Sequence, residues 1–372
     1  MTMATDKQDK VLNVPTLRFP EFSGEWDSCD LQSLCSPISA GHDKPDDGLY
    51  RLYGSTGVIG TTSNASYNKQ LVLIARVGAN AGYMQIVDEP CGVTDNTLVV
   101  EAKDWNRYIF YYLQHYNLNK LIFGSGQPLI TGGMLKKVPI RYGSLYERER
   151  IVKLLSIIDD RITTQIRIIE DLKSLSDVFC ERLYTHSEKE SWQTYKYADL
   201  FSISNERNSK LQYTNVLSAS QEYGMIERNE LNIDIKFEAS SITNYKIVRP
   251  NQYVIHLRSF QGGFAYSEKT GVCSPAYTIL VPNEKLSTAF LKYYFTSKKF
   301  IDSLRIVTYG IRDGRSISVE EFLQLKVTIP DIAHQQHIVQ VMQLWEEKIR
   351  TEEEYLSKLQ QQKKYLLSSM FI

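Results

Sequence analysis

The sequence predicts an α+β protein with an internal repeat, in which two globular domains of mixed α and β structure alternate with two long antiparallel helices. Two stretches, 145–184 and 333–371, contain no proline or glycine and repeat apolar residues at the spacing of a heptad seam. Short β-rich runs, turns and one helical run precede each stretch in the same order. Because strands and helices interleave without regular βαβ spacing, the class is α+β rather than α/β.

The first long helix is expected over residues 145–184. About 40 helical residues form a rod of roughly 60 Å, at 1.5 Å per residue. A rod of this length cannot bury an apolar seam by itself, so a second helix is expected beside it, as in a coiled coil. The seam residues, spaced 4, 3, 4, 7 and 3 apart, are Ile151, Leu155, Ile158, Ile162, Ile169 and Leu172.

The second long helix is expected over residues 333–372 and shares the register of the first. One constant shift in numbering, here called the repeat offset, carries Ile151 to Ile338 and the remaining seam positions to Met342, Trp345, Ile349, Leu356 and Leu359. The polar interruptions correspond as well, since the same offset maps Gln165 to Glu352 and Ser176 to Lys363. Shared interruptions favour an internal duplication over a chance match of two amphipathic helices. The globular domains then cover residues 1–144 and 185–332.

Composition excludes several classes of protein. A chain of 372 residues with 42% apolar residues is long enough for two or three globular domains. No apolar run approaches the length of a membrane span and the N-terminal segment lacks a hydrophobic core, so a cytoplasmic protein without a membrane span is expected. The five cysteines form no C-x-x-C pair, which argues against a zinc site and a disulfide framework.

Catalytic motifs are missing from the sequence. There is no Pro-Pro pair for an amino-methyltransferase motif and no G-x-x-x-x-G-K-[ST] loop for a nucleoside-triphosphate motor. We therefore expect no catalytic residue, no metal ligand and no bound cofactor. The formal net charge of zero disfavours a purely electrostatic, non-specific binder of nucleic acid. Two similar domains held at a set distance do suit duplex DNA, whose turns repeat roughly every 34 to 36 Å.

Several short segments, in this order and together with the two matching helices, resemble the specificity (S) subunits of Type I restriction-modification systems. The likeness extends from about Val14 to the end of the chain. The segments are Leu17-Arg-Phe-Pro-Glu-Phe22, Gly24-Glu-Trp26, Tyr53-Gly-Ser-Thr-Gly57, Arg76-Val-Gly78, Ala81-Gly82 and Gly124-Ser-Gly-Gln-Pro128.

The resemblance implies a function in DNA methylation and phage defence. Each globular domain would be a target recognition domain that reads one half of a bipartite DNA sequence, and the helices would set the gap and dock two methyltransferase (M) subunits. Restriction-translocase (R) subunits would join the complex. S-adenosylmethionine would belong to the M subunit, and ATP and Mg to the R subunit. One departure concerns the helix starts, where the family usually has Glu-Gln and this chain has Glu147-Arg148 and His334-Gln335.

Candidate DNA-reading residues are polar side chains expected on turns or strand ends, where they can reach a groove. For each of them an ordinary solvated side chain is the competing interpretation. Two arginines in a glycine-bounded loop, Arg312 and Arg315, are the strongest candidates because they have reach and no packing role. The set is Arg51, Tyr53, Ser55, Thr56, Asn64, Lys69, Arg76, Asn80, Gln127, Asn208, Lys210, Ser220, Tyr223, Arg258, Gln261, Tyr266, Arg312 and Arg315.

The alternative hypothesis is a non-catalytic scaffold whose helices recruit helical protein partners. Helix positions outside the seam, Leu154, Ile157, Ile166 and Ile168, predict apolar surface that awaits a partner. Salt dependence separates the two functions, because contacts to DNA phosphates make affinity fall steeply as salt rises.

Overall fold

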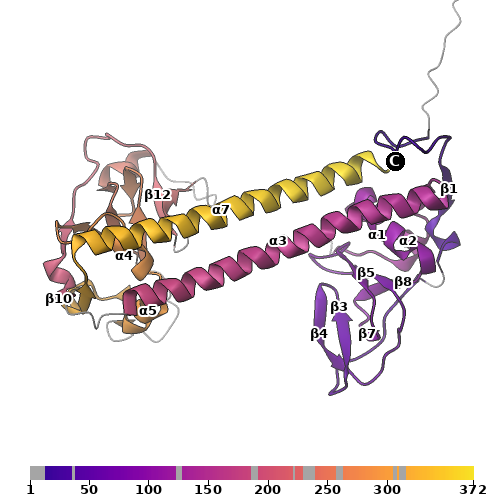
Figure 1. The fold of residues 1–372 in the computed structure, drawn as a ribbon, viewed down its shortest axis with the longest axis horizontal. Helices are drawn as coiled ribbons and strands as arrows, with labels where there is room; N and C mark the ends of the chain where they lie inside the picture. The colour runs from indigo at the N-terminus through magenta and orange to yellow at the C-terminus, as the bar shows by residue number, and fades with distance from the viewer. Residues whose placement is uncertain are drawn as a thin grey trace, which may run out of the picture. The chain divides into compact units, whose positions relative to one another are not determined.

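The computed structural model describes residues 13–35, 38–122, 128–185, 192–220, 223–228, 239–256, 263–304, 308–309 and 316–372. The chain divides into two compact units. Unit 1 comprises Met1–Ile166 and Glu354–Ile372, and unit 2 comprises Arg167–Glu353. Both long helices therefore contribute residues to both units (Figure 1).

Unit 1 contains three small sheets. Strand β1 (Asp27–Asp30) pairs with β9 (Pro139–Tyr142), and an antiparallel sheet has the order β2 (Ile38–Ala40), β8 (Thr97–Val100), β5 (Leu71–Ala75) and β6 (Met84–Val87). The third sheet has the order β4 (Gly57–Thr62), β3 (Tyr50–Gly54) and β7 (Cys91–Val93). All five residues of β5 are buried, because Val72 and Ile74 face one apolar cluster while Leu71 and Leu73 face another.

The helices of unit 1 cover its larger apolar cluster. They are α1 (Asn106–Tyr116), α2 (Gly132–Lys136), the first part of α3 (Leu145–Thr185) and the last part of α7 (Ile332–Ser369). The described 3₁₀ turns of this unit are η1 (Leu31–Ser33) between β1 and β2, η2 (Lys103–Trp105) between β8 and α1, and η3 (Leu118–Leu121) after α1. Tyr108 and Tyr112 of α1, Ile151 and Leu155 of α3, and Phe371 beyond α7 meet in this cluster.

Unit 2 repeats the plan. Its four-stranded sheet has the order β11 (Phe201–Ser204), β18 (Thr278–Pro282), β15 (Gln252–Ile255) and β16 (Phe264–Ser267). Four strand pairs accompany it, namely β10 (Gln193–Lys196) with β21 (Lys326–Ile329), β12 (Leu217–Ser220) with β13 (Gly224–Glu227), β14 (Lys246–Val248) with β17 (Gly271–Cys273), and β19 (Thr308–Tyr309) with β20 (Ser316–Ile317). Within the residues that the structure describes, the short helical elements of unit 2 are η4 (Tyr197–Asp199), η6 (Ala239–Asn244), α4 (Phe290–Tyr294), α5 (Lys298–Ser303) and α6 (Val319–Gln324).

The predicted fold class and internal repeat are confirmed. The repeat offset that relates Ile151 to Ile338 also relates the first residues of α2 and α6, of β9 and β21, and of α3 and α7. The helix caps repeat too, since Thr131 accepts a hydrogen bond from the Met134 N–H, and its equivalent Ser318 accepts one from the Glu321 N–H. The two units therefore share elements, element order and capping chemistry.

The ends of the long helices close the two cores in the same way. Tyr184 of α3 lies in unit 2, with its ring centre 5.3 Å from Phe290 and 5.2 Å from Tyr294. Phe371, its equivalent by the repeat offset, lies in unit 1, with its ring centre 5.5 Å from Tyr108 and 5.7 Å from Tyr112. Each unit thus buries one aromatic ring from a helix end against two rings of a short helix.

The helices α3 and α7 run antiparallel. Within unit 2, Lys173 pairs with Glu353 at 2.7 Å, and further along α3 Phe179 packs against Trp345, which precedes Glu353 on α7. Every predicted seam residue is either buried or half-buried. Buried are Ile151, Leu155, Ile158, Ile169, Ile338, Met342 and Leu359, and half-buried are Ile162, Leu172, Trp345, Ile349 and Leu356.

Of the apolar positions expected outside the seam, Ile157, Ile166 and Ile168 are exposed. Leu154 differs from the expectation, because it is half-buried and packs against the core of unit 1. Within the described ranges, none of the helices combines the length and the apolar character that a membrane span requires.

Candidate nucleic-acid interface

A β-hairpin in unit 1 carries four of the predicted DNA-reading residues. Strands β3 and β4 lie beside β7 (Figure 1), and Gly54 pairs with Gly57, so Ser55 and Thr56 form the turn. The amide of Gln85 donates to the carbonyl oxygens of Gly54 and Ser55, at 3.1 and 3.3 Å. Gly57 has φ of +147°, a conformation that glycine adopts readily. The turn is held in place while the Thr56 side chain is exposed.

Arg51 and Tyr53 belong to the same hairpin and share one carboxylate. The Tyr53 hydroxyl donates to Glu89 at 2.6 Å, and the Arg51 guanidinium lies 3.3 Å from the same oxygen. Burial and this hydrogen bond raise the pKa of Tyr53, so the phenol stays protonated. The Arg51 side chain is exposed, and such surface pairs are weak. Arg51 can therefore exchange Glu89 for a DNA phosphate or a guanine at little cost.

The corresponding hairpin in unit 2 is formed by β12 and β13. Ser220 pairs with Gly224 at its end, the Tyr223 N–H donates to the Ser220 hydroxyl, and the Tyr223 ring is exposed. Gly224 has φ of +69°, and a Cβ there would lie 2.4 Å from the carbonyl oxygen of Tyr266. Only glycine fits this approach, which presses the hairpin against β16. The structure thus places Ser220 and Tyr223 at a hairpin end, as it places Ser55 and Thr56.

Arg76 and Asn80 follow strand β5 at its carboxyl end. The Arg76 backbone bonds to Asn96 and Ile130, and its side-chain Nε is buried without a hydrogen-bond partner in the part of the chain that the structure describes. Asn80 is exposed in the next turn. Asn64 donates to Ser66 at 3.1 Å.

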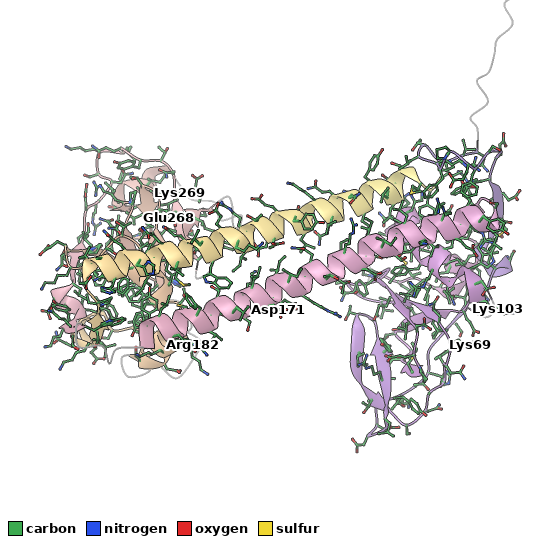
Figure 2. The ribbon with its side chains drawn as sticks, in the orientation of Figure 1. Lys69, Lys103, Asp171, Arg182, Glu268 and Lys269 are labelled. Atoms are coloured by element: carbon green, nitrogen blue, oxygen red, sulfur yellow. The ribbon has the colours of Figure 1, made fainter. Side chains whose placement is uncertain are left out.

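Lys69 lies before the first residue of β5 and pairs with Glu101 at 3.2 Å. Figure 2 labels Lys69 and Lys103 in unit 1. Together with Arg148 these two lysines line a cleft of about 710 Å³.

Two predicted residues of unit 2 have internal roles. Asn208 is buried, donates to the Tyr213 carbonyl at 2.7 Å and accepts from the Tyr213 N–H at 3.2 Å, which fixes a loop on which Lys210 is exposed. Tyr266 is buried in the core and donates to Asn251 at 3.3 Å. Five predicted residues lie outside the described ranges: Gln127, Arg258, Gln261, Arg312 and Arg315.

Sequence reasoning missed an exposed aliphatic surface on the unit 1 hairpin. Val58 and Ile59 are consecutive residues of β4, with exposed fractions of 49% and 58%, and Leu49 just before β3 is 96% exposed. Consecutive outward-facing residues break the alternation of a strand. The signal in the sequence was the pair of aliphatic residues enclosed by Gly57 and Gly60.

Among the residues that the structure describes, no group of three or more His, Cys, Asp and Glu side chains is arranged to hold a metal ion. Both hairpins present hydrogen-bonding groups, and the unit 1 hairpin also presents exposed aliphatic side chains.

Comparison with known proteins assigns the family. The model of the Type I restriction modification DNA specificity domain matches residues 35–174 and again residues 189–361. The chain belongs to this family. The two matches of the specificity domain follow the duplication described above.

Individual relatives agree with the assignment. The chain is 28% identical over 138 residues to the Type I restriction enzyme EcoprrI specificity subunit of Escherichia coli, an alignment that spans 35% of the chain and 33% of that relative. A crystal structure of a Type I restriction-modification S subunit from M. genitalium matches with a TM-score of 0.60 at 16% identity, covering 96% of this chain and 99% of that one.

A chain from a structure described as the basis of complex assembly and conformational transition in the Type I R-M system matches with a TM-score of 0.57. Its identity is 13%, and the match covers 93% of this chain and 97% of that one. At these identities the two structural matches establish a shared fold.

Proposed function

We propose that this chain is the DNA-binding specificity subunit of a Type I restriction-modification complex, in which each unit reads one half of a bipartite target. The observation that carries the proposal is the duplication of a unit with a fixed hairpin whose end presents polar groups, Ser55 and Thr56 in unit 1 and Ser220 and Tyr223 in unit 2. A two-stranded ribbon fits the DNA major groove, and such groups bond to base edges and phosphates.

The long helices act as the spacer between the half-sites. This part of the proposal is supported by the shared register of α3 and α7, whose first residues are related by the repeat offset. Inserting four residues after Gln165 and four after its equivalent Glu352 adds about 6 Å of helix. Since B-DNA rises about 3.4 Å per base pair, the gap should lengthen by about one to two base pairs while both half-sites stay the same. A change in the half-sites would contradict the spacer role.

Two M subunits dock on the helices outside the seam. Support comes from exposed apolar side chains that recur at positions related by the repeat offset. A partner present in two copies would therefore find an equivalent apolar surface on each unit. Unit 1 carries Ile157, Tyr355 and Tyr365, and unit 2 carries their equivalents Leu344, Ile168 and Val178. Replacing Ile157 and Leu344 with Asp should abolish binding of both M subunits, whereas each single replacement should remove one.

The chain itself is non-catalytic in this proposal. S-adenosylmethionine belongs to the M subunits, ATP and Mg to the R subunits, and the assembled complex acts in the cytoplasm in DNA methylation and phage defence. The family assignment supports this division of labour.

A gel shift or footprint with the M subunit present tests the proposal. One gapped sequence should bind tightly and scrambled DNA weakly, and affinity should fall steeply with salt. Equal affinity for all sequences would overturn it. Affinity for a protein partner with no response to DNA would instead favour the scaffold function, to which the exposed helix residues are also suited.

A further inference from the structure

The aliphatic surface of the unit 1 hairpin is produced by a β-bulge. Leu52 pairs with Gly60 and Tyr53 pairs with Val58, so Ile59 is the additional residue of β4. A bulge redirects the side chains on either side of it. As a result, both Val58 and Ile59 are exposed on a strand that forms the edge of its sheet. Exposed aliphatic edge strands promote aggregation. Such a strand is therefore expected to have a binding function that covers it.

This surface is held in a fixed position. A Cβ at Gly54 would lie 2.8 Å from Cγ2 of Ile59, so the isoleucine side chain rests on a glycine that leaves room for it. Leu49 follows a loop in which Asp46 accepts hydrogen bonds from Ser63 at 2.7 Å and from the Gly48 N–H at 2.8 Å. The Ser63 contact joins the loop before Leu49 to the residue after β4, and the Gly48 contact lies within the loop. A fixed surface binds its ligand without a large loss of conformational entropy.

The repeat identifies what kind of ligand the surface contacts. In the described part of the unit 2 hairpin the register is regular and has no bulge. Leu217 and Met225 are buried there, and Ile226 is half-buried. A protein partner present in two copies would require the same surface on both units. The two halves of an asymmetric DNA target, in contrast, require different surfaces. An exposed aliphatic pair that occurs on only one of the two hairpins, as far as the structure describes them, therefore fits DNA better than a duplicated partner.

The apolar group that DNA offers in the major groove is the C5 methyl of thymine. Arg51, Ser55 and Thr56 on the same hairpin supply hydrogen-bonding groups beside the aliphatic side chains. We infer that Val58 and Ile59 contact thymine methyl groups, so that unit 1 selects a half-site containing thymine. This inference rests on the proposed DNA-reading function of unit 1.

Replacement of thymine by deoxyuridine tests the inference, because it removes the methyl group and leaves base pairing intact. The target is first identified from the methylated sites of a host that carries the protein. Single thymines of each half-site are then replaced, and affinity is measured with the M subunit present. The wild-type chain should lose about fourfold in affinity for each contacted methyl, equivalent to about 0.8 kcal/mol, at positions within one half-site.

The double variant Val58→Ser/Ile59→Ser removes every side-chain methyl group at these two positions, whereas threonine would keep a methyl that can itself contact thymine. It should bind the thymine target several-fold more weakly and should no longer distinguish thymine from deoxyuridine. Ile203→Ser is the matched control, since Ile203 lies on β11 of unit 2 and is 43% exposed. The control should respond to deoxyuridine like the wild-type chain.

Three results would overturn the inference. The first is specific binding by the wild-type chain that no deoxyuridine replacement in either half-site weakens. The second is a double variant that still distinguishes the two bases. The third is a double variant that loses the M subunit rather than DNA, which would identify the surface as a protein contact. Each of these results leaves the proposed function intact as long as the chain still prefers the gapped target. The proposed function itself fails only if scrambled DNA binds equally well.

Discussion

Units 1 and 2 are alike where a globule meets the long helices. The Tyr111 hydroxyl of α1 donates to Asp159 of α3 at 2.9 Å, and the Tyr293 hydroxyl of α4 donates to Glu346 of α7 at 3.0 Å. Asp159 and Glu346 are equivalent by the repeat offset. The lysine that completes each contact comes from a different element, Lys363 of α7 at 2.6 Å and Lys292 of α4 at 3.0 Å. Both units therefore have the same tyrosine–carboxylate–lysine contact, but the lysine comes from a long helix in unit 1 and from a short helix in unit 2.

The units differ where each long helix begins. In unit 1, Glu147 is 1% exposed and receives two hydrogen bonds from Arg18, at 2.7 and 2.8 Å. In unit 2 the equivalent position is His334, whose exposed ring contacts Asp331. The residues after these also differ, since the Arg148 guanidinium lies over the Trp105 ring, whereas the Gln335 amide bonds to the backbone of Ser287 and Lys285.

These comparisons teach that duplication preserved the packing of the units while the chemistry at the helix starts and hairpins diverged. Packing must satisfy the same geometry twice, so Asp159 and Glu346 are equivalent even though the tyrosines and lysines that contact them are not. Hairpins that face different DNA half-sites are under no such constraint.

The largest effect is expected from the aromatic rings at the helix ends. Phe371→Ala should destabilise unit 1, and Tyr184→Ala unit 2, by about 3 to 5 kcal/mol each, since each removes a buried ring. Hydrogen exchange should show lost protection confined to the unit concerned. Tyr365→Ala, at an exposed position of α7, is the control and should change little. If both variants lost protection in the same unit, the two helix ends would not be equivalent.

The buried ion pair of unit 1 should have no counterpart in unit 2. Arg18→Met leaves the Glu147 carboxylate buried without its guanidinium, which should cost about 3 kcal/mol in denaturant unfolding. Adding Glu147→Met should recover most of this loss, because no unpaired charge is then left. His334→Gln at the equivalent exposed position should leave the unfolding curve unchanged. A double variant as unstable as Arg18→Met alone would assign the loss to packing instead of charge.

Smaller and equal effects are expected from the tyrosine hydroxyls. Tyr111→Phe and Tyr293→Phe each remove one hydrogen bond to a carboxylate, and each should destabilise its own unit by about 1 to 2 kcal/mol. Both tyrosine rings are buried, so the ring packing is retained. The comparison is sharpened by measuring both variants under one condition. Effects that differ by more than twofold would mean that the exchanged lysines have altered the contact.

The smallest effect is expected from the caps of the two short helices. Thr131→Ala and Ser318→Ala each remove a side-chain acceptor for an N–H of the first helical turn, at a cost of about 1 kcal/mol. Faster hydrogen exchange at Met134 and at Glu321 should report the two losses separately. No change at either amide would contradict the equivalence of the caps.

The parts of the fold that the sequence predicted are those with local signals. Heptad spacing specified α3 and α7, because apolar residues at a regular interval are visible within each helix alone. Partners distant in sequence gave no such signal. Glu147 reads as a solvated helix residue until Arg18, 129 residues away, is placed beside it.

The candidate site was less predictable, because a polar side chain can hydrogen-bond within its own fold instead of contacting a ligand. Asn208 and Tyr266 were chosen for their hydrogen-bonding groups, which the structure shows bonded to Tyr213 and Asn251. The hairpin turns were chosen on turn chemistry and do present exposed groups. The bulge at Ile59 depends on strand register, which one sequence does not specify. The DNA contacts of all these residues stay predictions.

Mapping the methylated sites in a host that carries this chain and its methyltransferase subunit tests the central claim most directly. One chain with two different reading units should direct methylation to a single bipartite sequence, whose two unequal halves are separated by a constant gap of unspecified bases. Methylation of one continuous sequence, or of sites without a common sequence, would contradict the account.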